Sequence, residues 1–221
     1  GCFPSRGCKL KLLQYWGDGF PPPGIVKRMK TCETNNPSLK YKFIDSGGAA
    51  KRLNRWYGSD IANGFLAIRM EAMRSDVFRV AWVLQKGGFY VDAASEVLGP
   101  LSKWVTQGKL TLIKKPHMVK SESVWNGFIY APTPSHPFLQ ELWSHQQRIL
   151  LTRQCEQIWK ETGPGLFRDV LKNSAPSMIS SISILTTEKF DKFFRFGSSS
   201  AFIDTSQHWS KRQARGESLF Y

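Results

Sequence analysis

The chain has 221 residues, of which 41% are hydrophobic and 22% are charged, and this composition is enough for one sizeable α/β core. Eight Trp, 15 Phe and six Tyr residues exclude disorder over most of the chain, and the lack of any run of about 18 apolar residues excludes a membrane-spanning helix. The formal charge of +14 favours polyanionic partners, but Lys and Arg are scattered, so we expect no nucleic-acid-binding arm.

Short apolar runs alternate along the chain with longer stretches that have helical features. Strands are predicted at residues 9–16, 41–45, 89–91, 110–113, 124–130 and 181–185. Helices are predicted from about residue 25, at 47–57, at 65–86, from 137 towards 159, and at 166–171. This alternation predicts an α/β layered sheet with parallel strands and right-handed crossovers, and a loop after Gly197.

The segment at 65–86 gives the clearest helix prediction. Met73, Val77, Val80 and Leu84 recur at steps of four, three and four residues, which places them on one helix face. The Gly87-Gly88 pair then predicts the end of the helix, because glycine adopts the left-handed cap conformation without steric cost.

The most informative residues lie around the strand predicted at 89–91. Asp92 directly follows this strand, and ligands of open α/β sheets bind beyond the carboxyl ends of the strands. Asp76 and Arg79 are three residues apart on the preceding helix, so they share a face. This acid and this base could hold a sugar hydroxyl and a phosphate oxygen; a simple ion pair on a solvated helix face is the alternative.

Several segments resemble glycosyltransferase family 32, in the order that the family has them. They are LQYWGD at 13–18, RSDVFR at 74–79, GGFYVDA at 87–93, EVLGPL at 96–101, NGFI at 126–129, HPFL at 136–139 and TGP at 162–164. The resemblance covers roughly residues 10–170 and implies a single-domain GT-A fold, which is a Rossmann-like nucleotide-sugar-binding fold. It also implies a nucleotide-sugar donor, a divalent metal ion and retention of configuration at the anomeric carbon.

The resemblance gives roles to individual residues. Trp16 matches the aromatic residue that stacks on the donor base, although a core aromatic is the alternative. Asp76 matches the acid that binds donor-sugar hydroxyls, Arg79 the basic residue near the sugar and diphosphate, and Asp92 the first acid of the Asp-x-Asp motif. These three are the expected catalytic residues. The donor-binding set further includes Gln14, Tyr15, Trp16, Tyr90 and Ala93, with sheet packing as the alternative for Tyr90, and the expected acceptor side includes Asn126 and Gly163.

The chain departs from the family at the metal site. It reads Asp92-Ala93-Ala94 where the family has Asp-x-Asp, and the Ala94 side chain cannot bind a metal ion. The expected metal is Mn²⁺ or Mg²⁺, held by Asp92 and by His208 from the C-terminal segment, with an exposed loop histidine as the alternative for His208. We expect residues 197–221 to form a C-terminal loop that closes the donor site.

Three classes of function remain open. The first is a retaining hexosyltransferase, with UDP-hexose as the favoured donor and GDP-mannose next, acting on a glycan, a lipid-linked glycan or another acceptor. The second is a catalytically weakened domain that binds nucleotide-sugar or carbohydrate. A nucleic-acid-binding module ranks last, because no nucleic-acid motif is present.

Location and thiol chemistry are also left open by the sequence. The chain shows no signal peptide, so we expect it in the cytoplasm, or in a lumen if it is excised from a larger anchored protein. The positive charge is also compatible with peripheral association with an anionic membrane. Cys2 and Cys8 could form a disulfide, with free thiols as the alternative.

Overall fold

A computed structural model describes residues 9–17, 19–114, 122–186, 194–195 and 208–221. Within these residues, six strands form the main sheet in the spatial order β2-β1-β3-β6-β5-β7. Their bounds are β1 Lys11–Tyr15, β2 Lys40–Ile44, β3 Gly88–Val91, β5 Leu110–Lys114, β6 Trp125–Ala131 and β7 Ile182–Thr186. Two short strands, β4 (Glu96–Val97) and β8 (Phe194–Arg195), pair beside the main sheet.

The sheet is mixed, so the prediction of parallel strands is wrong for β6. β1 runs parallel to β2 and β3, and β5 runs parallel to β7, but β6 is antiparallel to both β3 and β5. Every residue of β6 is buried. A strand that is covered on both faces has the same continuous apolar sequence in either direction, so its sequence does not reveal its orientation.

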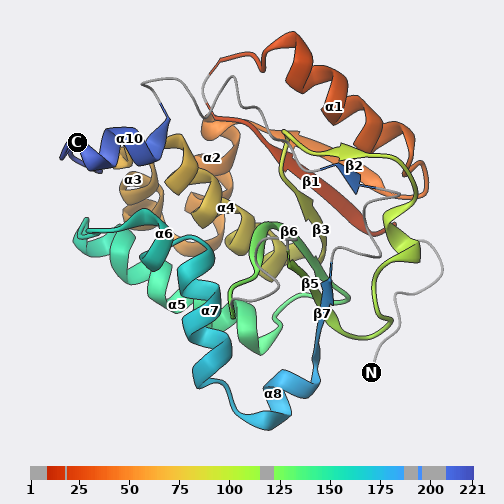
Figure 1. The fold of residues 1–221 in the computed structure, drawn as a ribbon. Helices are drawn as coiled ribbons and strands as arrows, with labels where there is room; N and C mark the ends of the chain where they lie inside the picture. The colour runs from red at the N-terminus through yellow and green to blue at the C-terminus, as the bar shows by residue number, and fades with distance from the viewer. Residues whose placement is uncertain (1–8, 18, 115–121, 187–193, 196–207) are drawn as a thin grey trace.

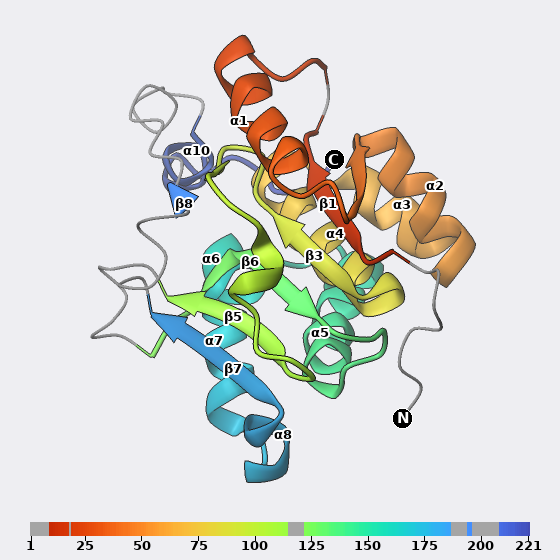
Figure 2. The same cartoon turned by 90° about the vertical axis from the view of Figure 1, so that its right-hand side faces the viewer.

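Helices cover both faces of the sheet (Figures 1 and 2). Helices α2 to α7 lie on one side and α1 lies on the other. Their bounds are α1 Pro23–Thr34, α2 Ser46–Tyr57, α3 Ser59–Ala67, α4 Glu71–Lys86, α5 Pro137–Thr152, α6 Ile158–Glu161, α7 Pro164–Asn173, α8 Pro176–Ser180 and α10 Trp209–Ala214, with a 3-10 turn η1 at Leu101–Lys103. None of the described helices combines the length and the apolar character needed to cross a membrane.

Alternate residues of each strand divide between two hydrophobic cores. In β3, Tyr90 belongs to the larger core beneath α4, whereas Phe89 and Val91 belong to the smaller core on the α1 side. This follows from the two-residue period of a strand, which sends successive side chains to opposite faces. Asp92 comes two residues after Tyr90, so the same alternation directs its side chain towards α4.

Two predicted helices are shorter in the structure. The stretch predicted as one helix at 65–86 is divided between α3 and α4, because Ile68–Met70 is extended and Ile68 pairs with Phe220. Ile68 and Met70 are fully buried, so they continue the apolar pattern across the break and conceal it. The helix predicted towards residue 159 ends at Thr152, where Arg153 takes a left-handed conformation with φ of 54°. Gly87 ends α4 at a φ of 61°, as predicted.

The C-terminal segment is partly ordered against the body of the domain. Residues 197–207 lie outside the described part of the chain, but α10 follows and then Leu219 and Phe220 are buried in the larger core. The expectation of a loop after Gly197 is therefore wrong for Trp209–Ala214, which form α10. Cys2 and Cys8 also lie outside the described residues, and Cys32 and Cys155 are free.

Candidate active site

The carboxyl end of β3 meets the N-terminal half of α4, and four of the predicted residues converge there, namely Asp76, Arg79, Tyr90 and Asp92. The Tyr90 hydroxyl donates a 2.7 Å hydrogen bond to Asp92 Oδ1. Arg79 Nη1 lies 3.3 Å from the same oxygen, and Arg79 Nη2 lies 3.1 Å from Asp76 Oδ1. The carboxylates of Asp92, at the end of the sheet strand, and of Asp76, on the helix, therefore share the guanidinium group of Arg79. These three side chains, together with Tyr90, are called the charged group below.

Arg79 is held on every side. Its Nε donates to the Ser75 carbonyl at 3.0 Å, its Nη2 to Ser75 Oγ at 2.8 Å, and its Nη1 to the Asn126 carbonyl at 2.9 Å. The guanidinium carbon also lies 4.7 Å from the centre of the Tyr90 ring. A planar, charged fork fixed by this many partners has one orientation available, so the positions of both carboxylates follow from it.

Asp76 is buried and has partners from three other segments. The Asn126 amide donates a 2.8 Å hydrogen bond to Asp76 Oδ1, and the Gln146 amide donates to the Asp76 carbonyl at 3.2 Å and to the Thr162 carbonyl at 3.1 Å. Gln146 on α5 therefore ties the Asp76 turn of α4 to the segment before α7. Gly163 lies in that segment, and a side chain there would come within 3.1 Å of Asp76 Oδ2.

Burial and charge determine the protonation of the group. Burial raises the pKa of Asp76 to about 6, although the charge of Arg79 and the hydrogen bond from Asn126 lower it. Burial lowers the pKa of Arg79, but Asp92, Tyr90 and Asp76 raise it further, so Arg79 stays charged. Burial raises the pKa of Tyr90 well above its usual value, so the phenol stays protonated and can donate to Asp92. With both acids ionised, the group carries a net charge of −1.

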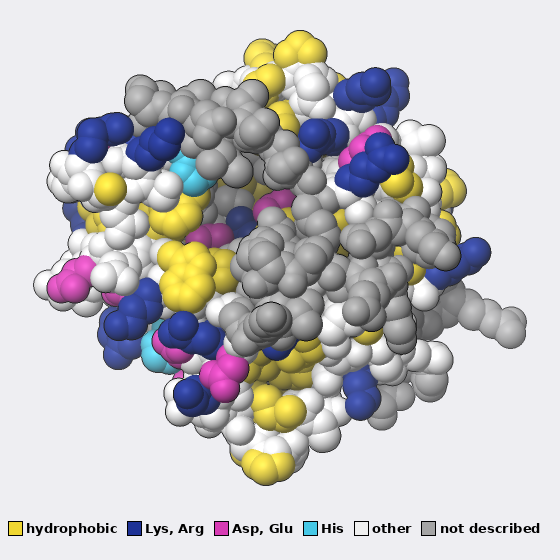
Figure 3. Space-filling view, in the orientation of Figure 1, with side chains coloured by type: hydrophobic (Ala, Val, Ile, Leu, Met, Phe, Trp, Pro, Cys, Tyr) yellow, Lys and Arg dark blue, Asp and Glu magenta, His cyan; other side chains and the backbone are white. Residues whose placement is uncertain are grey.

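This charged group is open to solvent on one side. The Asp92 side chain is 29% exposed, whereas the side chains of Asp76 and Arg79 are at most 10% exposed. Figure 3 shows a hollow over α4 with acidic and basic side chains at its bottom. A ligand in this hollow would meet Asp92 first.

The backbone around Asp92 is fixed from two directions. Arg28, Thr31 and Asn35 on one face of α1 hydrogen-bond to the segment from Ala94 to Val97, and Arg28 Nη1 donates to the Ala94 carbonyl at 2.7 Å. From β6, the Gly127 carbonyl accepts a 2.8 Å hydrogen bond from the Asp92 amide. A Cβ atom at residue 127 would collide with Asp92 Oδ2 and the Trp125 ring, so glycine is needed for this close approach.

The other predicted donor residues lie at the end of β1. Trp16 directly follows β1 and is partly exposed. Gln14 is fully buried, and its amide donates to the Asp92 carbonyl at 3.4 Å. Tyr15 is 4% exposed and its hydroxyl bonds to Ser46 and Glu71, while Ala93 is 5% exposed.

Asn126, predicted on the acceptor side, is 4% exposed and contacts both Asp76 and Arg79. Asn126 therefore supports the charged group.

The residues expected to hold a metal ion do not form a preassembled centre. Among the described residues, no three or more His, Cys, Asp or Glu side chains are close enough to share a metal ion. His208 caps α10 and its Nδ1 lies 2.7 Å from Ser210 Oγ. Asp92 Oδ1 is occupied by Tyr90 and Arg79, and Ala94 has no side-chain oxygen. The described side chains therefore do not fit a divalent-metal site built by the protein alone.

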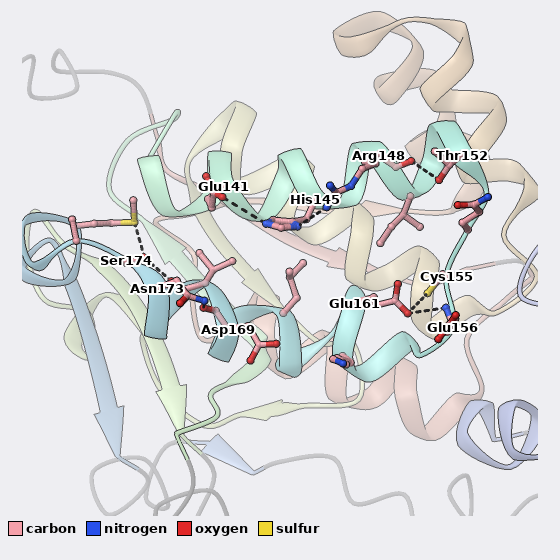
Figure 4. Close-up of a pocket in the computed structure, with 17 residues that line it drawn as sticks. Glu141, His145, Arg148, Thr152, Cys155, Glu156, Glu161, Asp169, Asn173 and Ser174 are labelled. Atoms are coloured by element: carbon pink, nitrogen blue, oxygen red, sulfur yellow. Dashed lines mark hydrogen bonds and ion pairs between the residues drawn. The ribbon is translucent and has the colours of Figure 1, made fainter.

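A sizeable pocket lies elsewhere. A cavity of about 770 Å³ lies between α5, α6 and α7, and its lining contains none of the predicted site residues. Figure 4 shows Glu141, His145 and Arg148 in a row along α5, opposite Asp169 on α7. Glu161 accepts hydrogen bonds from the Glu156 and Gln157 amides, which fixes the turn between α5 and α6. The polar groups that converge at Asp92 are therefore separate from this pocket.

Sequence reasoning missed the residues that support the charged group. Ser75 lies inside the RSDVFR segment at 74–79 but received no role there, and Gln146 lies in no segment that the sequence singles out. Ser75 could have been found from its place four residues before Arg79 on the same helix face. Gln146 carried no signal, because its partners come from α4 and from the segment before α7.

Comparison with known proteins supports the resemblance. No family model matches the chain. It is 23% identical over 223 aligned residues to the initiation-specific alpha-1,6-mannosyltransferase of Candida albicans, covering 84% of this chain and 58% of that protein. It is 22% identical over 173 residues to the protein of the same name from Schizosaccharomyces pombe, covering 66% of this chain and 44% of that protein. The chain thus spans about half the length of these curated relatives.

A solved structure shows the same fold. The PaToxG glycosyltransferase superimposes with a TM-score of 0.58 at 15% identity, covering 96% of this chain and 79% of that one. This match and the mixed, helix-covered sheet confirm the predicted single-domain α/β fold of the GT-A type. Together with the two mannosyltransferases, it confirms that the chain resembles glycosyltransferase family 32.

Proposed function

We propose that this chain is a retaining glycosyltransferase domain that moves a hexose from a nucleotide-sugar to a glycan acceptor, with the donor sugar at Asp76, Arg79 and Asp92. The observation that supports this most is the pair of carboxylates sharing one buried guanidinium at the carboxyl end of β3. Ligands of open α/β sheets bind at this edge. The relatives named as glycosyltransferases support the same reaction class.

The charge of the group suits the reaction. Cleavage of a glycosidic bond to a diphosphate places positive charge on the sugar ring and its anomeric carbon. Fixed groups that carry a net charge of −1 in a buried setting stabilise that charge without reorganising. In this proposal Asp92 contacts the ligand, Asp76 selects the sugar by accepting from its hydroxyls, and Arg79 keeps both carboxylates in position.

Donor identity is part of the proposal. Trp16 at the end of β1 offers a partly exposed ring for stacking on a nucleobase, for which we favour a UDP-hexose. The two yeast relatives are named as mannosyltransferases, which supports GDP-mannose as the second donor to test.

Metal use is proposed in a limited form. Because the described side chains do not fit a complete metal site, we expect Mn²⁺ or Mg²⁺ to bind weakly to the free protein. A nucleoside diphosphate supplies phosphate oxygens of the kind that these ions prefer, so the ion would arrive with the donor. Asp92 is the protein side chain that would contact it, and His208 remains a candidate second ligand.

A second function is favoured by Ala94. A domain that lacks the second acid could bind a nucleotide-sugar without transferring it. Turnover of the donor distinguishes the two, because a binding domain would leave the nucleotide-sugar intact.

A thermal-shift panel tests donor binding. UDP-glucose, GDP-mannose, UDP and GDP are each added with and without Mn²⁺ to the wild-type chain and to Asp92→Asn. A ligand that binds only the folded state raises the melting temperature. We expect a nucleotide-sugar to stabilise the wild-type chain and to lose most of this effect in Asp92→Asn. No shift with any donor would contradict the proposed function.

A further inference from the structure

A large aromatic side chain lies close to the proposed donor-sugar site without belonging to it. Trp159 on α6 is 37% exposed, while its neighbour Ile158 is buried. A Cβ atom on Gly163 would lie 3.1 Å from Asp76 Oδ2 on one side and 3.1 Å from the Trp159 carbonyl on the other. The backbone of Trp159 is thus separated from the Asp76 carboxylate by Gly163.

The ring of Trp159 is fixed. A Cβ atom on Gly165 would come within 2.8 Å of two atoms of the six-membered ring, so the indole rests directly on the first turn of α7. The Arg168 guanidinium carbon lies 5.3 Å from the ring centre, and Arg168 is itself held by Asp169 at 2.7 Å. A ring supported in this way keeps its orientation when a ligand binds, so little conformational entropy is lost.

Trp159 is not part of the lining of the pocket of Figure 4. Lys160 and Glu161, the next two residues of α6, line that pocket, but Trp159 does not. Figure 3 shows a hydrophobic patch over α6 at the rim of the hollow above α4. The exposed hydrophobic residue of α6 is Trp159.

We propose that Trp159 is the platform on which a sugar ring of the acceptor glycan stacks, beside the donor sugar. This inference rests on the proposed function, because it takes Asp76 as the place of the donor sugar. One face of a hexopyranose carries C–H groups of slightly positive charge, which pack against the negative face of an indole ring. The acceptor class is therefore an oligosaccharide.

The test compares Trp159→Ala and Trp159→Phe with Trp56→Ala. Trp56 on α2 is the matched control, because a cation also lies over its ring, with Lys86 Nζ 5.3 Å from the ring centre. Lys86 is the last residue of α4 and comes ten residues after Asp76. The probes are mannotriose, maltotriose and cellotriose. Saturation-transfer NMR measures their binding without any reaction, and release of nucleoside diphosphate in the absence of glycan measures donor hydrolysis.

We expect at least one trisaccharide to bind the wild-type chain and Trp56→Ala. Trp159→Ala should weaken that binding at least about tenfold, or 1.4 kcal/mol, and Trp159→Phe should lose less. Donor hydrolysis should stay within about twofold in all three variants, since Trp159 does not contact the charged group. The inference fails if no trisaccharide binds the wild-type chain, if Trp159→Ala binds it normally, or if hydrolysis falls as much as binding. Trisaccharide binding that needs Trp159, without donor hydrolysis by the wild-type chain, would contradict the proposed function instead.

Discussion

Replacing Asp76 with Asn should separate stability from activity. The substitution keeps the shape of the side chain and removes one of the two negative charges that share Arg79. Burial raises the pKa of Asp76 from 3.8 to about 6. At neutral pH the ionised carboxylate of Asp76 is therefore less favourable in the folded chain than in the unfolded chain.

The magnitude follows from that pKa difference. One unit of pKa corresponds to about 1.4 kcal/mol, so the ionised Asp76 destabilises the folded state by at most about 3 kcal/mol above pH 6. Between pH 3.8 and about 6 the folded state binds more protons, so stability falls as pH rises through this window. Asp76→Asn removes this loss. The variant should be as stable as the wild type at pH 3.5 and more stable at pH 7.

Activity should change in the opposite direction. The proposed role of Asp76 is to accept from the donor sugar and to stabilise positive charge, so Asp76→Asn should lower donor turnover about 100-fold or more. Denaturant unfolding at pH 3.5 and pH 7 measures stability, and nucleoside diphosphate release measures turnover. The matched control is Asp60→Asn, an exposed acid in the first turn of α3, which should change neither. A variant that is less stable at pH 7 yet fully active would refute this reasoning.

Three further substitutions test separate parts of the site. Trp16→Ala should weaken donor binding about tenfold, measured by calorimetry, because base stacking is worth about 1–3 kcal/mol; unchanged binding with a large loss of stability would make Trp16 a core residue. Gly127→Ala should displace the Asp92 side chain, because the new Cβ collides with Asp92 Oδ2, and should lower donor turnover at least about tenfold. Normal turnover of the variant would show that the position of the Asp92 carboxylate is unimportant. Ala94→Asp should tighten Mn²⁺ binding and raise turnover in calorimetric and kinetic assays, whereas no change in either would mean that the site is complete without that carboxylate.

The charged group was predictable because local rules place it. Asp76 and Arg79 share a helix face by their spacing, and Asp92 shares a strand face with Tyr90, so both rules direct the side chains towards each other. The alternative of a solvated ion pair is contradicted, because Asp76 and Arg79 are buried at 7% and 5% exposure. The predicted roles of these residues in donor binding remain predictions.

The parts that were missed depend on contacts between distant segments. The break between α3 and α4 needs the pairing of Ile68 with Phe220, which is 152 residues later in the chain (220 minus 68). The support of Asp76 by Gln146 needs α5 to cross α4. The direction of β6 depends on its neighbours in space. A pattern of apolar residues records burial but does not record which segment provides it.

The most direct test of the central claim is donor turnover by the charged group. Wild-type chain and Arg79→Lys are incubated with UDP-glucose and with GDP-mannose in the presence of Mn²⁺, and the released nucleoside diphosphate and the anomeric configuration of the first sugar product are measured by NMR. Lysine keeps the charge but cannot hold both carboxylates and the Asn126 carbonyl at once. We predict release by the wild-type chain with retained configuration, and at least about a 100-fold slower release by Arg79→Lys with a smaller loss of donor affinity. Intact donors after incubation with the wild-type chain, or equal rates in the two proteins, would contradict the assignment of this group as the transferase centre.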